Sequence, residues 1–309
     1  MSTLRRELAP SDTSVDGPQA EPSSDDPADA LDLRGRRWRE FKRNRLAVAS
    51  AVFLIVLILA TIFATVIAPH DPAATNLRLR YAPPGTSGHI LGTDDLGRDI
   101  LSRLLVGGRV SLAAGLGSVA LGLTIAIPLG LVAGYFGGRL DAVVMWVVDA
   151  ILAIPPLLLV FAIAGVLGPS LRSMIIALSV YFTPLFFRLV RGEVHALKQG
   201  QLVTAERALG AKNGYILRRH ILPNLASPLI VEASLAVGIG ILAEASMSFL
   251  GLGVQPPTSS WGLMLGLAFN QIQQHPFLIV VPATAIALTV LGLNLLGDGM
   301  RDALGKIEQ

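Results

Sequence analysis

The chain contains no cysteine, so a disulfide framework and a thiolate metal site are both excluded. It is also poor in charge, because only 15% of its 309 residues are Asp, Glu, Lys or Arg, whereas about 25% is usual for a soluble domain. A charged side chain near the centre of a bilayer is costly, and a deficit of charge is therefore typical of membrane proteins. The 52% hydrophobic content and the mean hydropathy of +0.60 indicate the same class.

Sequence signatures of several common catalytic sites are missing as well. There is no Gly-x-x-x-x-Gly-Lys-Ser/Thr phosphate loop, so the chain itself should not bind and hydrolyse ATP. There is no Gly-x-Ser-x-Gly sequence of the kind that carries a hydrolase serine. None of the five histidines has a second histidine four residues away that would chelate zinc on a helix. We therefore predict no catalytic residue, no metal site and no cofactor in this chain.

Six apolar stretches are long enough to cross a hydrocarbon core of about 30 Å. A spanning segment must satisfy its own backbone hydrogen bonds, so we predict six transmembrane helices and an all-α polytopic fold. Frequent glycines suit close packing between such helices, and the Pro155–Pro156 pair makes the third span the weakest of the six. The predicted spans are about 47–68, 109–134, 140–166, 171–190, 226–250 and 277–297, within a transmembrane domain over 47–305.

The basic residues predict the orientation of these spans. Seven Lys or Arg residues lie within 34–45, immediately before the first span, and six lie within 191–225. The loop at 251–276 has none. By the positive-inside rule, both termini and the 191–225 loop should be cytoplasmic, in a multi-pass protein of the cell membrane. The same rule explains the net charge of +3, so the charge does not indicate nucleic-acid binding. We expect the chain to contact membrane lipid and no nucleic acid.

The first 46 residues differ in composition from the rest. Residues 1–33 contain eight acidic residues and four prolines, and such a segment cannot bury enough apolar surface to fold. We predict a disordered acidic cytoplasmic tail there, which is either dispensable or a docking element. Residues 34–46 are predicted to form a basic amphipathic segment at the membrane interface.

The external loop at 69–105 contains a short turn crowded with charge: Asp94, Asp95, Arg98 and Asp99. Paired carboxylates can perform acid–base chemistry or hold a divalent metal. We favour a structural arrangement instead, in which Asp94 or Asp95 caps a helix that begins near Leu96, while Arg98 and Asp99 make local ion pairs.

The most informative segment is 204–223, a hydrophilic stretch between two apolar runs. Ala205 and Ala208 give a first short helix small faces, and Gly210 should end it. A second short helix is predicted from about Asn213, as its N-cap, to Leu222, ending before Pro223. Small residues on an exposed helix let a partner's groove approach the backbone, so this segment is predicted to dock a soluble protein; an ordinary loop is the alternative.

The segment resembles the coupling loop of ABC importer permeases, whose pattern is Glu-Ala-Ala, three residues, Gly, nine residues, then Ile-x-Leu-Pro. Gly210 and Leu222–Pro223 stand at the matching positions, whereas His220 stands where Ile is usual. Thr204, Ala205 and Glu206 occupy the first three positions, so the leading Glu is displaced by two residues. The stretches 91–99, 248–257 and 295–302 resemble the peptide/nickel branch, the C subunits of dipeptide and oligopeptide permeases.

This resemblance implies a permease subunit that forms half of a pathway for di- or oligopeptides and performs no catalysis itself. Its implied partners are a second homologous permease subunit, two cytoplasmic ATPase subunits that bind ATP and Mg, and an external substrate-binding lipoprotein. It also implies that Asp94, Asp95, Arg98 and Asp99 lie at the external mouth, near where that lipoprotein docks. The candidate pathway residues are Asp149, Glu244, Thr284 and Asn294, although the two carboxylates could equally pair with another helix.

Two alternatives remain at this stage. Nickel chelates and haem are as compatible with the sequence as peptides are, because selection in such systems lies largely with the binding protein. An ion-driven secondary transporter would show charged relays in several spans and two similar halves. Neither is visible: intramembrane charge is sparse, and the stretches 47–166 and 171–297 show no convincing similarity to each other.

Overall fold

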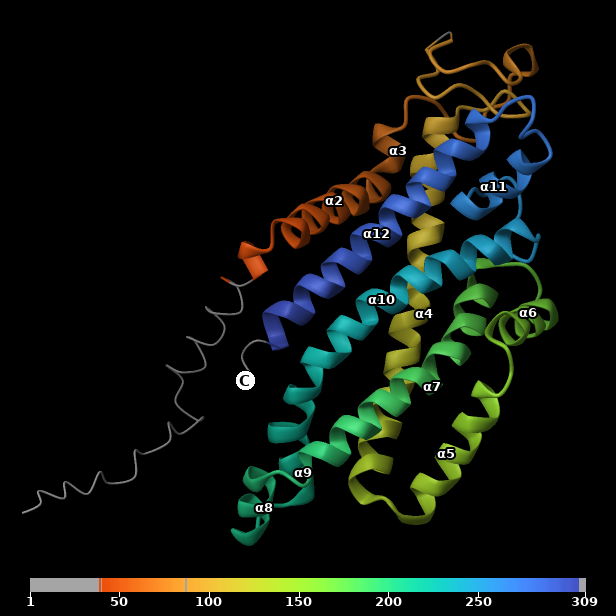
Figure 1. The fold of residues 1–309 in the computed structure, drawn as a ribbon. Helices are drawn as coiled ribbons and strands as arrows, with labels where there is room; N and C mark the ends of the chain where they lie inside the picture. Colours follow the sequence, from red (N-terminus) through yellow and green to blue (C-terminus); the bar gives the residue numbers. More distant parts are fainter. Residues whose placement is uncertain (1–38, 40, 87, 306–309) are drawn as a thin grey trace, which may run out of the picture.

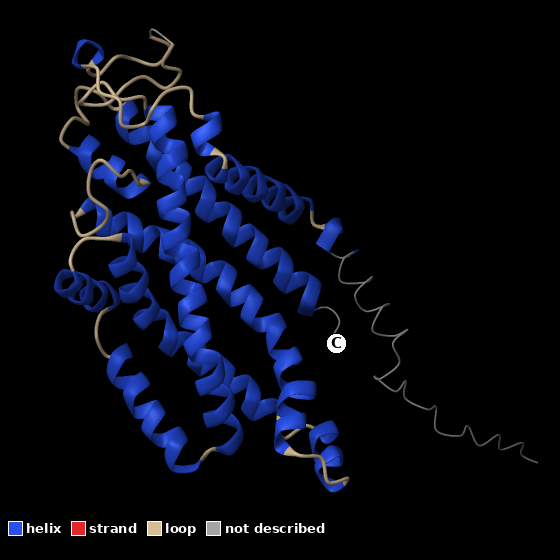
Figure 2. Ribbon diagram, turned by 180° about the vertical axis from the view of Figure 1, so that it is seen from behind, coloured by secondary structure: helices blue, strands red, loops and turns tan. Residues whose placement is uncertain are grey.

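The computed structural model describes residues 39, 41–86 and 88–305. This part of the chain is built of helices, which confirms the predicted all-α fold class. Figures 1 and 2 show a bundle of long helices with loops at both ends and no strand among the described residues. Five helices are long and apolar enough to cross a membrane, or six if one bent pair counts as a span. The predicted tail 1–33 and much of the predicted interfacial segment 34–46 lie outside the described residues.

Most predicted spans correspond to single long helices. Helix α2 (Arg45–Ile62) is followed by one turn, α3 (Ala64–Ile67). Three other predicted spans correspond to helices that begin or end beyond the predicted limits, because these helices continue from the apolar stretch into polar sequence. These are α4 (Ile100–Phe136), α7 (Leu171–Leu197) and α12 (Phe277–Gly305).

The third predicted span, 140–166, is not one straight helix. It is divided into α5 (Gly138–Leu152) and α6 (Pro156–Leu167), which are bent by 91° relative to each other. The break falls at the proline pair, since proline has no N–H to donate to the preceding turn. By contrast, α4 and α7 continue through Pro128 and Pro184. The prediction of one continuous helix over 140–166 is therefore wrong. The position of the break, at the Pro155–Pro156 pair, agrees with the prediction that this span is the weakest.

Helices α4 and α7 form the closest pair, and glycines on α4 make the approach possible. A Cβ added at Gly130 would lie 2.7 Å from Val190 Cβ, and one added at Gly134 would lie 3.0 Å from Val194 Cβ. A distance of 2.7 Å is shorter than real Cβ atoms show and 3.0 Å is tighter than most of their contacts, so a larger residue at either position would push the helices apart. The α7 side of the contact, which includes Phe187, Val190 and Val194, is completely buried. The predicted glycine-mediated packing is confirmed for this pair.

The start of α4 corrects the sequence prediction for the external loop. The helix begins at Ile100 and its N-cap is Asp99, whose side chain accepts a hydrogen bond from the Ser102 N–H. Neither Asp94 nor Asp95 caps a helix at Leu96. The residues before Asp99 instead form turns, in which Gly97 has φ +72° and lies against the Asn76 backbone. A side chain at Gly97 would meet that backbone, so this crossing of the loop requires glycine.

The 201–223 segment also differs from its prediction. Helix α8 (Gln201–Ala208) ends before Gly210, as expected, but the second helix does not stop before Pro223. Helix α9 (Asn213–Ile216) continues through a π-helical stretch, η2 (Leu217–Ile221), into α10 (Leu222–Phe249). Pro223 lies in the first turn of α10, where its missing N–H costs little. The N-cap of α9 is Lys212 rather than Asn213.

The predicted outer loop at 251–276 contains a further helix, α11 (Trp261–Phe269). Ser260 caps it by accepting from the Leu263 N–H at 3.1 Å. The completely buried Trp261 donates its indole N–H to the Leu104 carbonyl at 2.9 Å and its backbone N–H to Ser111 Oγ at 3.1 Å. Helix α11 is thereby fixed against α4, close to the turns of residues 69–99 at one end of the bundle (Figure 1).

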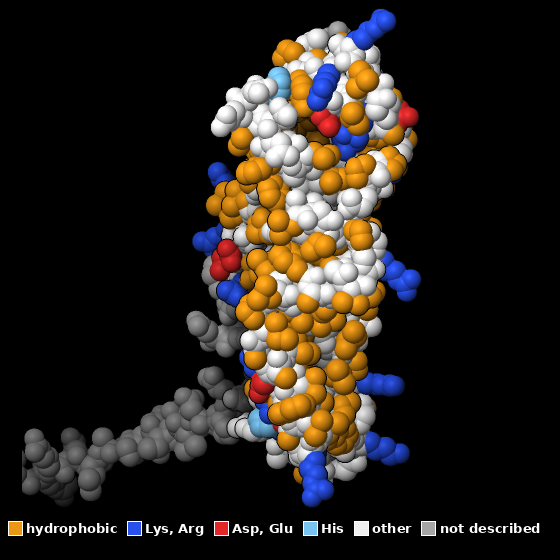
Figure 3. All heavy atoms as spheres, turned by 90° about the vertical axis from the view of Figure 1, so that its right-hand side faces the viewer, with side chains coloured by type: hydrophobic (Ala, Val, Ile, Leu, Met, Phe, Trp, Pro, Cys, Tyr) orange, Lys and Arg blue, Asp and Glu red, His pale blue; other side chains and the backbone are white. Residues whose placement is uncertain are grey.

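The opposite end of the bundle carries α8 and α9 (Figure 1). Between the two ends the surface is dominated by hydrophobic side chains, and several Lys and Arg side chains gather at the lower end in Figure 3. This distribution suits a bilayer around the middle of the bundle, and the cytoplasmic position of the lower end stays a prediction of the positive-inside rule.

The orientation is testable because the chain has no native cysteine. Single cysteines at the exposed positions Thr75 and Gln273 should react with an impermeant maleimide applied to intact cells, because both should face outward. A cysteine at the exposed Gln199 should react only after permeabilisation. Labelling of Gln199→Cys in intact cells would reverse the orientation.

Candidate functional site

The coupling knob, defined here as residues 201–216, is a compact unit rather than a loose loop. Val203 of α8 and Ile216 of α9 are buried and anchor it to the bundle. Exposed apolar side chains cover its outer side: Leu209 is 85% exposed and Tyr215 is 51% exposed. An anchored inner side with apolar side chains facing solvent is typical of a surface that a protein partner covers.

The knob is attached to the last turn of α4. Tyr135 Oη donates a hydrogen bond to Asn213 Oδ1 at 2.9 Å, and the Arg207 guanidinium lies over the Tyr135 ring at 5.1 Å. Lys198, between α7 and α8, donates to the Gly134 carbonyl at 2.8 Å. Asn213 thus has a tertiary hydrogen bond in place of its predicted capping role. The contacts of Tyr135 therefore join the knob to α4, and the Lys198 hydrogen bond joins the end of α7 to α4 just before the knob begins.

Two of the three residues that depart from the coupling-loop pattern, Glu206 and His220, contact each other. Glu206 Oε1 lies 3.3 Å from His220 Nε2, which joins α8 to η2 across the turn at Gly210. Neither side chain is fully exposed, so water screens the pair only in part. The displaced Glu and the unusual His therefore bring α8 of the knob close to η2, which follows the knob, although their geometry is not that of a hydrogen bond.

Gly210 makes the turn between α8 and α9. Its φ is +82°, in the left-handed region that glycine adopts without strain, which confirms the predicted conformation. A Cβ added there would meet no atom within 4 Å. The demand for glycine is therefore conformational and not steric.

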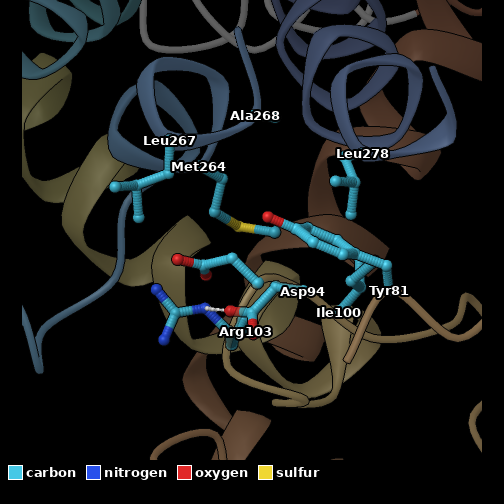
Figure 4. A pocket seen from close by; sticks show the side chains of 9 residues that line it. Tyr81, Asp94, Ile100, Arg103, Met264, Leu267, Ala268 and Leu278 are labelled. Atoms are coloured by element: carbon cyan, nitrogen blue, oxygen red, sulfur yellow. Dashed lines mark ion pairs between the residues drawn. The ribbon is translucent and has the colours of Figure 1, made fainter. Parts of the chain in front are cut away.

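The four charged residues of the outer turn do meet at one end of the bundle, but in two separate groups. Arg98 contacts Asp94 at 2.7 Å and Asp95 at 3.1 Å, and the buried Arg103 lies 3.4 Å from Asp94. Figure 4 shows Asp94 and Arg103 facing each other in a pocket that Met264, Leu267 and Leu278 line from the other side. The outer turn therefore lies across this pocket from α11 and α12.

Asp99 belongs to a second group that the sequence prediction missed. His70, His89 and Asp99 each place one possible ligand atom within 4.8 Å of the other two. Burial raises the pKa of Asp99, but hydrogen bonds from Ser102 and His89 lower it by more, so the pKa lies below its usual range. His70 and His89 precede Asp99 by 29 and 10 residues along an irregular loop, which is why helix-based ligand spacing did not reveal them.

The four candidate pathway residues have different environments. Asp149 is exposed and pairs with Arg188 of α7 at 2.5 Å. Thr284 and Asn294 are exposed on α12, and their pathway role stays a prediction. Glu244 is completely buried and accepts a hydrogen bond from Ser248 Oγ at 2.6 Å. The structure holds Glu244 between helices, and its pathway role stays a prediction beside the alternative of pairing with another helix.

Comparison with known proteins relates these features to a family. A family model described as "Binding-protein-dependent transport system inner membrane component" matches residues 126–306. A second, described as "N-terminal TM domain of oligopeptide transport permease C", matches residues 33–84. The two matches include both the coupling knob and the first span.

Individual relatives cover nearly the whole chain. The glutathione transport system permease protein GsiD of Pectobacterium atrosepticum is 44% identical over 271 residues, which is 86% of this chain and 89% of the relative. The dipeptide transport system permease protein DppC of Alkalihalophilus pseudofirmus is 41% identical over 287 residues, which is 92% of this chain and 94% of the relative. A solved structure of the MetNI methionine ABC transporter, in an inward-facing conformation, matches with a TM-score of 0.51 and 21% identity. It covers 63% of this chain and 93% of the matched chain, and it shows similarity of fold alone.

The Glu206–His220 contact can be measured with a double-mutant cycle of Glu206→Gln and His220→Gln. We expect a coupling energy of about 0.5–1 kcal/mol, in the range of partly exposed ion pairs. The measurement is the free energy of local opening of the 204–216 amides, from hydrogen exchange. A control cycle of Glu206→Gln with Arg301→Gln, on α12, should give no coupling. Equal values in the two cycles would show that the contact does not stabilise the knob.

Proposed function

Since the chain belongs to the family of binding-protein-dependent transport system inner membrane components, we propose that it is a permease subunit of an ATP-driven importer of short peptides. It forms half of the translocation pathway and performs no covalent chemistry. ATP and Mg are bound by partner subunits, in keeping with the missing phosphate loop.

The observation that carries this proposal is the anchored knob at the end of the bundle opposite the outer turn (Figure 1). An ATPase can shift a conformational equilibrium only through contacts that differ between the two states. A loose loop would absorb such a difference by bending. The knob is instead fixed to α4 by Tyr135, and Lys198 ties the adjoining end of α7 to α4, so force applied to the knob reaches the spanning helices.

The proposal includes the partners. Two cytoplasmic ATPase subunits bind the knobs of this chain and of a second homologous permease subunit. An external substrate-binding lipoprotein docks at the outer end, where the turns around Asp94, Asp95, Arg98 and Asp99 are held in shape by buried ion pairs and hydrogen bonds. Closure of the ATPase dimer carries the knobs inward, and the bundle opens outward to receive substrate. Both termini lie in the cytoplasm.

A short peptide is the proposed substrate. The two relatives are named for glutathione transport and dipeptide transport, and glutathione is a tripeptide. Nickel chelates and haem are the less favoured substrates. An ion-driven mechanism is disfavoured by the ionisable residues themselves, because the intramembrane carboxylates Asp149 and Glu244 do not form one chain: the first pairs with Arg188 and the second is buried beside Ser248.

The proposal predicts the effect of Gly210→Val. Valine at a φ of +82° costs about 1–3 kcal/mol of backbone strain, which a rotation of the knob would relieve. The variant should fold and insert, yet bind the ATPase subunits at least about ten-fold more weakly, a change that corresponds to about 1.4 kcal/mol. The measurements are subunit stoichiometry, ATPase rate and labelled-dipeptide uptake in ATP-supplied proteoliposomes without an ion gradient.

Two control variants isolate the cause. Asparagine tolerates a positive φ better than valine does, so Gly210→Asn should retain most activity. Gly192→Val adds the same side chain to α7, outside the knob, where φ is not positive and a Cβ meets no atom within 4 Å. It should assemble like the parent protein. If Gly210→Val assembles and transports normally, the knob does not depend on this turn. If uptake requires an ion gradient and not ATP, the proposed function is wrong.

A further inference from the structure

Three segments far apart in the sequence meet at the outer end of α4. His70 follows the first span, His89 lies in the turns of the outer loop, and Asp99 is the N-cap of α4. Asp99 Oδ1 lies 2.8 Å from His89 Nδ1 and 3.8 Å from His70 Nδ1. The two imidazole rings lie against each other with their centroids 4.3 Å apart. Two imidazoles and a carboxylate therefore converge on one point.

The carboxylate is held in a fixed position. Asp99 Oδ2 accepts hydrogen bonds from the Ser102 N–H at 2.8 Å and from Ser102 Oγ at 2.7 Å. Ser102 Oγ in turn accepts from the His70 backbone N–H at 3.2 Å. Oδ2 is thus occupied, and Oδ1 faces the two histidines. Such supporting hydrogen bonds orient the ligands in metal sites.

One side of the group is open to ligand. His89 and Asp99 are buried, whereas the His70 side chain is 38% exposed. All three residues line a pocket that Asn76 and Gly97 also border. The Nδ1 atom of His70 is buried but has no hydrogen-bond partner among the described residues. A buried nitrogen without a partner is costly, and a cation at this point would satisfy it.

Two of the three ligand-atom separations can be compared directly with those of a four-coordinate site, and the third is no more than 4.8 Å. Ligand atoms about 2.0–2.1 Å from a tetrahedral zinc ion lie about 3.3 Å from one another. The observed separations of 2.8 Å and 3.8 Å from Asp99 Oδ1 lie on either side of this value. Without a cation, His89 Nδ1 and Asp99 Oδ1 share a hydrogen bond. A bound cation would take the place of that proton, so these two atoms would move apart by about 0.5 Å and the partly exposed His70 would move closer by a similar amount.

We propose that His70, His89 and Asp99 form a binding site for one divalent transition-metal cation of the zinc type, with the fourth position open to the pocket. Imidazole nitrogen with a carboxylate is a suitable donor set for zinc, and three protein ligands leave a position for water or an outside ligand. The cation joins the end of the first span and the outer loop to α4. This site is independent of the proposed transport function.

The test uses the full-length protein in lipid nanodiscs, freed of metal with a chelator. Co²⁺ serves as a spectroscopic substitute for Zn²⁺, and Zn²⁺ should displace it. We expect one Co²⁺ per chain, with the visible absorption of a four-coordinate nitrogen and oxygen site. Zn²⁺ should also slow hydrogen exchange in the 88–99 segment.

The variants are His70→Gln and, as the matched control, His275→Gln. His70 is partly exposed, so its replacement should leave the fold intact while weakening Zn²⁺ binding at least about ten-fold. His275 lies at the same end of the bundle but stacks on Tyr81 at 4.4 Å, so its replacement should leave binding unchanged. The proposal is overturned if the parent binds no Zn²⁺ at micromolar concentration, or if His70→Gln binds it as tightly as the parent. It is also overturned if both variants lose affinity equally, which would indicate scattered surface histidines.

Discussion

The close approach of α4 and α7 is the contact on which the rest of the structure depends. Lipid offers no hydrophobic driving force between two apolar helices, so their association relies on tight van der Waals packing. Glycines on α4, such as Gly130 and Gly134, let the backbones come close enough for Val190 and Val194 to pack against them. A longer side chain at either glycine would separate the helices and move everything attached to their ends.

Both functional ends are attached to this pair. Helix α4 has 37 residues and, at about 1.5 Å per residue, is about 55 Å long. Its N-cap, Asp99, organises the outer turns and the two histidines beside it. Its last turn holds the coupling knob through Tyr135. We interpret α4 and α7 as a stiff connection between the outer end, where we propose that the binding protein docks, and the knob, where we propose that the ATPase subunits bind.

Local sequence rules predicted the features that depend on a few neighbouring residues. Apolar run length gave the spans, the proline pair marked the break in the third, and Gly210 ended α8 with a positive φ. Predictions failed where contacts between residues far apart in the sequence determine what a side chain does. Asn213 was expected to cap α9, but its side chain accepts a hydrogen bond from Tyr135, 78 residues earlier. The cluster at Asp99 likewise needs a fold that brings His70 and His89 together, and no spacing rule contains that information.

The central claim is that the coupling knob moves with α4 as one rigid body. Spin labels on cysteines at the exposed Phe136, at the end of α4, and Lys212, in the knob, can test it in the assembled transporter. The account predicts that the distance distribution between the two labels is narrow and the same with and without ATP. A distribution that broadens or shifts when ATP binds would show that the knob bends away from α4, and would contradict the account.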